Sequence, residues 1–142
     1  MVLVSPEKIA AVMALAAVPH SFAELDEMVS KGLPKGALKA SIDHICVSAE
    51  DRRQLLYRII PEATYKRRRE SLSADESERA ERLARIFATA AYVWNSDDDA
   101  RAFLTAPHAM LQGRSPLDVS LTELGARRVE ELLWRLFYGI AA

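Results

Sequence analysis

Signals for the start of a helix recur along the whole chain, and they constrain its fold more than any other feature. Seven amphipathic segments follow a Ser or Thr whose hydroxyl can accept a hydrogen bond from a free backbone amide of the first turn. These residues are Ser5, Ser21, Ser48, Ser73, Ser96, Ser115 and Thr122. A chain with so many helix caps is predicted to be all-α, with helices that are mostly short.

Proline and glutamate near these caps strengthen several of the predicted starts. Pro6 and Pro116 each follow a cap directly, at the first helical position, where no backbone N–H is needed. Glu24 and Glu76 each stand three residues after a serine, which is the spacing of a capping box. These four positions therefore set the register of four predicted helices.

The predicted helix ends follow from proline and glycine. The first helix should end at Pro19, and the fourth near Ile60 because Pro61 follows. The longest helix is predicted to run from Ser73 to Trp94. Its inner face is predicted to carry Ala80, Leu83, Ala84, Phe87, Ala91 and Trp94.

The size and composition of the chain are those of a small globular protein. With 142 residues it fits one domain, or two very small units that share a core, and its net charge of -1 gives no general attraction to nucleic acid or membranes. No run approaches the roughly 18 apolar residues of a membrane span. The single cysteine, Cys46, excludes an internal disulfide and fits a reducing cytosol. We therefore expect a cytoplasmic protein in which Cys46 is a small buried side chain.

The final segment has the period of a helix with one buried face. That face is predicted to carry Val129, Leu132, Leu133, Leu136, Phe137 and Ile140. At about 100° per residue, Trp134 and Tyr138 point away from it, onto a side that also carries charged residues. Two large aromatic residues on a polar helix face need a second explanation.

Two explanations are open for Trp134 and Tyr138. One is that a neighbouring helix of the same domain covers them, as is usual for large apolar side chains in a small all-α protein. The other is that they contact a partner, because Trp, Tyr and Arg dominate the energetics of protein interfaces. The helical pattern alone does not decide between the two.

A basic segment follows Pro61. Residues 50–70 contain seven basic and four acidic residues, and four of the basic ones, Lys66 to Arg69, are consecutive. Four consecutive cations span just over one helical turn, so two or three of them can face a phosphate backbone. Thr64 would lie near the helix start, where a hydroxyl can also meet phosphate. The alternative is a solvated basic face, which is commoner for an isolated run.

The surroundings of the basic segment favour DNA binding. Two short predicted helices meet at a tight turn, and the second one is basic, which is the outline of a helix-turn-helix whose second helix enters the major groove. The turn itself departs from the usual pattern, because Ile60-Pro61 stands where a glycine is often found. The predicted DNA-binding residues are Thr64, Lys66, Arg67, Arg68 and Arg69.

The sequence carries no recognisable arrangement of catalytic residues. The three histidines are scattered without metal-ligand spacing, and a nucleophile elbow, a phosphate-binding loop and a dinucleotide-binding glycine motif are all missing. The acidic run Asp97 to Asp99 lacks the glycine and distal glutamate of a calcium loop, and is interpreted as the first turn of a capped helix. We therefore expect a protein that is not an enzyme and that holds no cofactor or metal.

Several of these motifs together resemble the Xre/MbcA/ParS family of antitoxins, the partners of RES-domain toxins. The resemblance covers about Gly32 to Ala142, and it is most specific in the C-terminal part. In the first part it is carried by Gly32-Leu33-Pro34-Lys35, the basic segment Thr64 to Arg69, Leu72-Ser73, Glu76-Ser77 and Arg79. In the second it is carried by Phe103-Leu104, Pro107, Leu111, Gly113, Ser115-Pro116-Leu117, Thr122, Gly125-Ala126, Val129, Leu132-Leu133 and Gly139.

The resemblance implies an all-helical antitoxin that acts by binding. Its C-terminal domain would form a homodimer and bind the toxin, while its Xre-like domain would bind the operon's own promoter DNA. The toxins of this group resemble ADP-ribosyltransferases that consume NAD or modify proteins with it, and the antitoxin would cover the toxin's active-site cleft. The toxin-binding candidates in this sequence are Arg114, Trp134, Phe137, Tyr138 and Gly139, with the tail to Ala142.

The expected organisation has three parts. Residues 1–20 form an N-terminal helical extension, residues 21–72 an Xre-like helix-turn-helix region, and residues 73–142 the C-terminal domain for dimerisation and toxin binding. The alternative function is that of a stand-alone, dimeric helical transcription regulator without a toxin partner.

Overall fold

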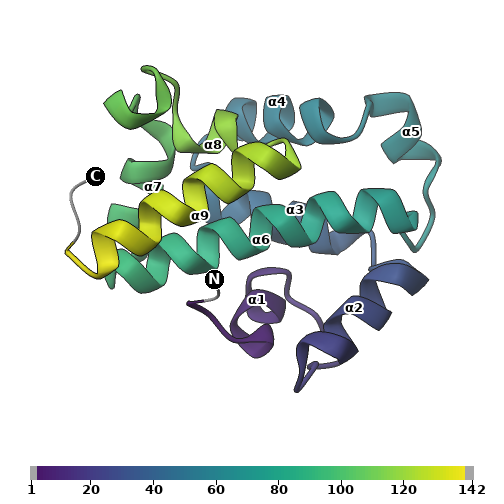
Figure 1. The fold of residues 1–142 in the computed structure, drawn as a ribbon. Helices are drawn as coiled ribbons and strands as arrows, with labels where there is room; N and C mark the ends of the chain where they lie inside the picture. The colour runs from purple at the N-terminus through teal and green to yellow at the C-terminus, as the bar shows by residue number, and fades with distance from the viewer. Residues whose placement is uncertain (1–2, 140–142) are drawn as a thin grey trace.

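The fold is built from helices, as the caps predict (Figure 1). The computed structural model describes residues 3–139. Its elements are α1 (Pro6–Val12), α2 (Phe22–Lys31), α3 (Gly36–Ile45), α4 (Ala49–Ile59), α5 (Glu62–Arg67), α6 (Ala74–Trp94), α7 (Asp97–Thr105), the 3-10 helix η1 (Ala109–Leu111), α8 (Pro116–Val119) and α9 (Glu123–Phe137). The prediction of an all-α fold is confirmed. No helix between residues 3 and 139 combines the length and the apolar character needed to cross a membrane.

The long helix α6 lies at the centre of the molecule (Figure 1). The helices α1, α2, α3, α7 and α9 all pack against it. Three of its alanines, Ala80, Ala84 and Ala90, have no exposed surface, so neighbouring helices can approach its backbone closely. One continuous hydrophobic cluster extends from Ile9 in α1 to Leu133 in α9. The N-terminal and C-terminal helices therefore share a single core.

The seven predicted cap hydroxyls are confirmed, but the capping box predicted at Ser21 is incomplete, because Glu24 Oε2 accepts from the His20 amide at 2.7 Å and not from the Ser21 amide. Each of the seven hydroxyls accepts a hydrogen bond from the amide three residues later. Ser73 forms a complete capping box, because its Oγ accepts from the Glu76 amide at 3.1 Å and its own amide donates to Glu76 Oε1 at 2.8 Å. Ser96 caps α7 through the Asp99 amide, in agreement with the interpretation of the acidic run as a first helical turn. Cys46 is buried, also as predicted.

The predicted end of the first helix at Pro19 is wrong. Helix α1 ends at Val12, and Ala14 follows in the left-handed conformation with φ 53°. The Leu15 amide then donates to the Ala10 carbonyl at 3.2 Å, which is the bond of a Schellman turn. Glycine usually occupies the left-handed position of this turn. Since alanine stands there in this chain, the sequence has no signal for the helix end.

Two aromatic residues predicted to lie on buried helix faces are exposed instead. Trp94 and Phe137 are both 41% exposed. Each stands at the end of its helix, where it contacts another aromatic ring, Phe103 or Tyr92 respectively, at the margin of the core. Helical spacing predicts the direction of a side chain but not how far a neighbouring helix extends over it. The prediction for Ile140 lies outside the described residues.

A short backbone contact joins the start of α3 to the start of α6. The Leu72 amide donates to the Leu33 carbonyl at 2.9 Å, and the Lys35 amide donates to the Glu70 carbonyl at 2.8 Å. The Leu33 amide donates to the buried hydroxyl of Ser77 at 2.8 Å. These bonds fix the segment that links α5 to α6, and with it the position of the basic helix.

Candidate nucleic-acid and partner surfaces

Helices α4 and α5 are two short helices joined by a tight turn, which is the outline predicted for the helix-turn-helix. Helix α4 ends at Ile59 as predicted, and α5 begins at Glu62, so the turn contains only Ile60 and Pro61. Ile60 is fully buried and extended, which anchors the turn in the core. The turn therefore needs no glycine, because its backbone is not left-handed and the buried Ile60 side chain holds it in place.

Tyr65 holds the short helix α5 in place. Its ring packs edge-on against Tyr57 of α4 at a centroid distance of 6.4 Å, and the Lys35 ammonium lies 4.3 Å from its centroid. Partial burial raises the pKa of the Tyr65 hydroxyl. Tyr65 thus packs α5 against α4 and Lys35, while Glu62, Ala63, Lys66 and Arg67 are exposed.

The four consecutive cations at the end of α5 have different environments. Arg68 donates two hydrogen bonds to the buried carboxylate of Glu76, at 2.9 and 3.2 Å. Burial alone raises the pKa of Glu76, but the hydrogen bonds from Arg68 and Ser73 lower it below its ordinary value. Lys66 pairs with Glu62 at the surface. Within the described part of the chain, Arg67 and Arg69 are exposed and make no ion pair.

The arrangement separates the predicted DNA-binding residues into two groups. Arg67 and Arg69 are exposed, Lys66 lies in an exposed pair, and Thr64 is half-buried, so these four can reach a ligand. Arg68 instead stabilises the junction of α5 with α6. Whether any of the five contacts DNA stays a prediction.

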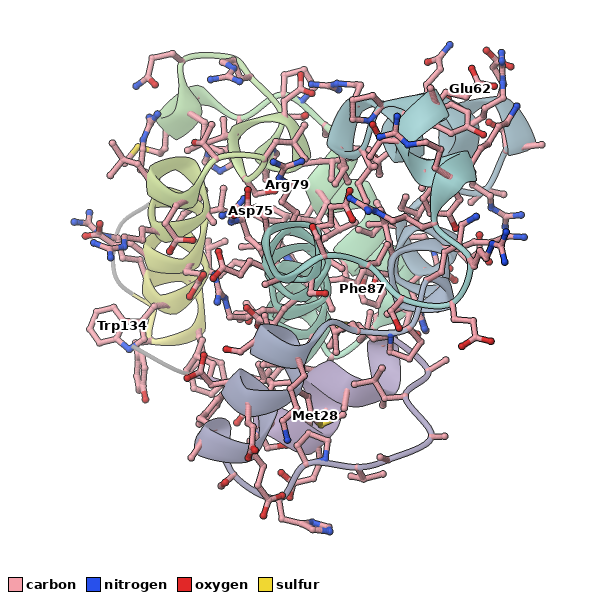
Figure 2. All side chains as sticks on the ribbon, turned by 90° about the vertical axis from the view of Figure 1, so that its right-hand side faces the viewer. Met28, Glu62, Asp75, Arg79, Phe87 and Trp134 are labelled. Atoms are coloured by element: carbon pink, nitrogen blue, oxygen red, sulfur yellow. The ribbon has the colours of Figure 1, made fainter. Side chains whose placement is uncertain are left out.

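The C-terminal end of α9 carries an exposed group of aromatic rings. Tyr138 contacts Trp134 at a centroid distance of 4.9 Å and Phe137 at 5.0 Å, and Phe137 contacts Tyr92 of α6 at 5.2 Å. We call these four residues the aromatic cluster. Tyr138 is 57% exposed, Phe137 41% and Tyr92 40%, while Trp134 is half-buried. Trp134 projects from the edge of the molecule in Figure 2.

Three of the predicted toxin-binding residues thus lie together. Gly139 follows them directly, with φ 70°, and ends the helix. Arg114 is separate: its described hydrogen bonds join it to His108, Leu111 and the Asp118 carbonyl, near η1 and α8. Tyr92 was not predicted from the sequence, because it stands on a different helix, and only the packing of α6 on α9 brings it to the cluster. The tail beyond Gly139 lies outside the described residues.

A groove of about 1130 Å³ runs beside the aromatic cluster, between α2 and α9, with α6 as its floor. Trp134 and the 45%-exposed Phe22 contribute aromatic surface to it. Arg85 of α6 pairs with Glu81 of the same helix at 2.9 Å and with Glu130 of α9 at 3.0 Å. Burial raises the pKa of Glu81, against the opposing effect of Arg85, and the nearby Glu130 adds to the rise.

The fold and these surfaces define a class of protein: a small all-α chain in which a helix-turn-helix unit shares its core with a second helical domain. Both parts of the chain match domains of known protein families. Residues 24–85 match the antitoxin Xre-like helix-turn-helix domain, and residues 89–139 match the antitoxin Xre/MbcA/ParS C-terminal toxin-binding domain. The chain therefore belongs to the Xre/MbcA/ParS family of antitoxins, as the sequence motifs predict.

A curated relative agrees with this assignment. Over 84 residues the chain is 36% identical to a protein named Antitoxin Xre from Pseudomonas putida. The match covers 57% of this chain and 53% of that protein, so it spans about half the length of the relative.

Proposed function

We propose that this chain is the antitoxin of a type II toxin–antitoxin system, and that it neutralises its toxin by binding it through the aromatic cluster. The observation that carries the proposal is the exposure of Phe137 and Tyr138 at the end of the region that matches a toxin-binding domain. Clustered exposed aromatic side chains are typical of the centre of a protein interface. The position of the cluster thus agrees with the function of the family.

The geometry of the cluster favours tight binding. Tyr138 packs against both Trp134 and Phe137, so the rings hold one another in place before any partner arrives. A partner that covers them would therefore lose little side-chain freedom, which is a main cost of association. Interface Trp and Tyr residues of this kind contribute about 2 kcal/mol or more each when truncated to alanine.

The proposed toxin is a RES-domain protein encoded in the same operon, which consumes NAD or transfers ADP-ribose to a protein. Binding of the antitoxin would cover its active site. We further propose that the antitoxin is a homodimer. These three points rest on the resemblance of the sequence to the family.

The same chain is proposed to bind promoter DNA and repress its own operon. The support is the match of residues 24–85 to a helix-turn-helix domain, together with the exposed cations of α5. Phosphate contacts supply most of the affinity of such proteins and make it depend strongly on salt. Arg67 and Arg69 are the cations that the fold leaves free for this role.

Co-purification of the chain with the product of the adjacent gene tests the toxin proposal. The expected result is a stable complex in which the partner no longer consumes NAD, while the free partner does. Trp134→Ala combined with Tyr138→Ala should weaken the complex by several kcal/mol and restore NAD consumption. Circular dichroism should show unchanged helicity, because both rings lie at the margin of the core.

Leu124→Ala is the matched control for this experiment. Leu124 lies on the same helix, at its opposite end, and is 71% exposed, so its removal takes away apolar surface without touching the cluster. Affinity that falls equally in both variants would argue against a specific role of the aromatic cluster. If no complex forms while promoter binding persists, the chain is a stand-alone transcription regulator.

Replacement of Arg67 and Arg69 by alanine tests the DNA proposal. The slope of log K against log salt should become shallower by about 0.9 for each DNA phosphate that the variant no longer neutralises, and binding should weaken on every DNA sequence. Lys8→Ala serves as the control, since Lys8 lies over Tyr92, away from α5. Promoter binding that is indifferent to the two arginines would move the DNA contact to another surface.

A further inference from the structure

A second, smaller pocket lies between α4, α6 and the loop that joins α8 to α9. Its volume is about 180 Å³. The pocket is lined by Arg58, Ile59, Arg79, Arg82, Leu83, Ser120 and Leu121. Among these described lining residues, every charged one is an arginine. Three arginines from two helices thus line one small pocket, together with three aliphatic side chains and Ser120.

The arginines keep most of their hydrogen-bonding capacity. A guanidinium group has five N–H donors. Within the described chain, Arg58 uses one of them on Asp118, Arg79 one on the Ile59 carbonyl, and Arg82 two, on Glu123 and the Leu121 carbonyl. The remaining donors are available to an acceptor that enters the pocket.

The carboxylates that neutralise these arginines stand outside the pocket lining. Their side chains are well exposed: Asp118 43%, Asp75 81% and Glu123 56%. The Arg58 and Arg79 side chains are exposed as well, and ion pairs between exposed groups contribute about 0–1 kcal/mol, whereas Arg82 is only 17% exposed. An anion with several oxygens can therefore replace or share the contacts of Arg58 and Arg79 at little cost.

We propose that this pocket binds a phosphate group. A phosphate presents oxygen acceptors on all sides, and the planar donor fork of arginine matches phosphate oxygens in pairs. Ile59, Leu83 and Leu121 place apolar surface beside the three arginines, and apolar surroundings strengthen the attraction between a guanidinium group and an anion. The group has two sources: a phosphodiester of DNA, or free phosphate and its monoesters.

The position of the pocket makes a DNA source accessible. Figure 2 looks along α6 from its first turn, and Arg79 with Asp75 lies there between α9 on one side and α5, marked by Glu62, on the other. Arg79 also donates to Ile59, the last residue of α4 before the turn. The pocket thus adjoins the helix-turn-helix. If the phosphate group belongs to DNA, the inference rests on the proposed promoter binding. If it is free phosphate or a monoester, the inference is independent of that proposal.

Titration with inorganic phosphate at constant ionic strength, balanced with sodium chloride, tests the pocket directly. The Nε–Hε signals of Arg58, Arg79 and Arg82 in the NMR spectrum should shift and saturate. Arg79→Gln should weaken phosphate binding about tenfold, the effect of removing one charge-assisted hydrogen bond. Arg58→Gln is the second variant, since Arg58 bonds only the exposed Asp118 in the described chain and its replacement spares the fold.

Arg135→Gln is the matched control. Its side chain is 39% exposed and pairs with a carboxylate four residues away, as the 41%-exposed Arg79 does with Asp75. The control should leave both phosphate binding and promoter binding at the wild-type level.

A promoter duplex supplies the second arm of the experiment. If the salt slope of promoter binding falls by about 0.9 in Arg58→Gln, the phosphate comes from the DNA backbone. If phosphate saturates the pocket while that slope is unchanged, or while the chain binds no promoter, the ligand is free phosphate or a monoester. Shifts that do not saturate, or that Arg135 shows equally, overturn the inference whatever the DNA result.

Discussion

Replacement of Arg68 by alanine should destabilise the fold, although Arg68 belongs to a run of basic residues that resembles a DNA contact. Its guanidinium donates two hydrogen bonds to Glu76, whose side chain is 7% exposed. The same carboxylate accepts from the Ser73 amide and so completes the cap of α6. Without Arg68, a nearly buried carboxylate would keep only that backbone donor.

The expected loss of stability follows from the burial of the two partners. Removal of one member of a fully buried ion pair costs about 3–5 kcal/mol. Since Arg68 is 35% exposed, water replaces part of the interaction, and we expect a loss of about 2 kcal/mol. For a chain of this size that corresponds to a fall in Tm of about 4–8 °C.

Thermal unfolding followed by circular dichroism measures this loss, with Arg67→Ala as the control. The control should change stability by less than about 0.5 kcal/mol, as is usual for an exposed residue.

The stabilisation by Arg68 should also depend on pH, with a sign set by Glu76. Because the folded-state pKa of Glu76 is lowered, its contribution is present above the unfolded pKa and is lost as pH falls through the folded pKa. The Tm difference should therefore stay constant from pH 7 down to the ordinary glutamate pKa of about 4.3, and shrink as pH falls further.

Equal Tm values for Arg68→Ala and Arg67→Ala at neutral pH would refute this reasoning. A Tm difference that persists undiminished in acid would refute the role of Glu76 in particular. The outcome also decides how DNA-binding data are interpreted, since weaker promoter binding by Arg68→Ala would partly reflect a displaced α5. Arg67 and Arg69 are the positions that report on DNA alone.

Two further predictions concern buried polar groups. Ser77→Ala removes the acceptor of the buried Leu33 amide, so urea unfolding should show that the free energy of unfolding falls by about 1–3 kcal/mol. Ser71→Ala, at an exposed position, is the control and should leave the free energy of unfolding unchanged. Glu81→Gln should stabilise the chain at neutral pH by up to about 1 kcal/mol, because burial raises the folded-state pKa of Glu81 and so makes its ionised form costly, while Arg85 keeps its ion pair with Glu130. That gain should disappear as pH falls below the ordinary glutamate pKa of about 4.3, and a gain that is constant with pH would contradict the assignment.

The helix starts could be predicted from the sequence because a cap is a local interaction. Each cap hydroxyl accepts from an amide three residues away, so the pattern carries its own geometry. The end of α1 could not be predicted, because Ala14 adopts a left-handed conformation that packing imposes and that alanine does not signal. A proline such as Pro61 predicts the end of a helix only where the helix continues up to it, as α4 does and α1 does not.

The surfaces were harder to predict than the helices. Helical spacing correctly placed Trp134 and Tyr138 away from the fully buried face of α9, but it placed Phe137 on that face, where the structure exposes it. The basic run gave no indication that Arg68 turns inward, since Glu76 is eight residues away and α5 ends between them. Contacts between helices determine both the exposure of Phe137 and the orientation of Arg68, and these contacts cannot be deduced from a single sequence.

Helix α6 determines how the two proposed surfaces relate to each other. Its first turn holds the end of α5 through Glu76, and its last turn contributes Tyr92 to the aromatic cluster. With 21 residues the helix is about 30 Å long, and its central alanines are fully buried. A rigid helix of this length keeps the basic helix and the aromatic cluster at opposite ends of the molecule. The proposed toxin and promoter sites therefore lie about 30 Å apart within one chain.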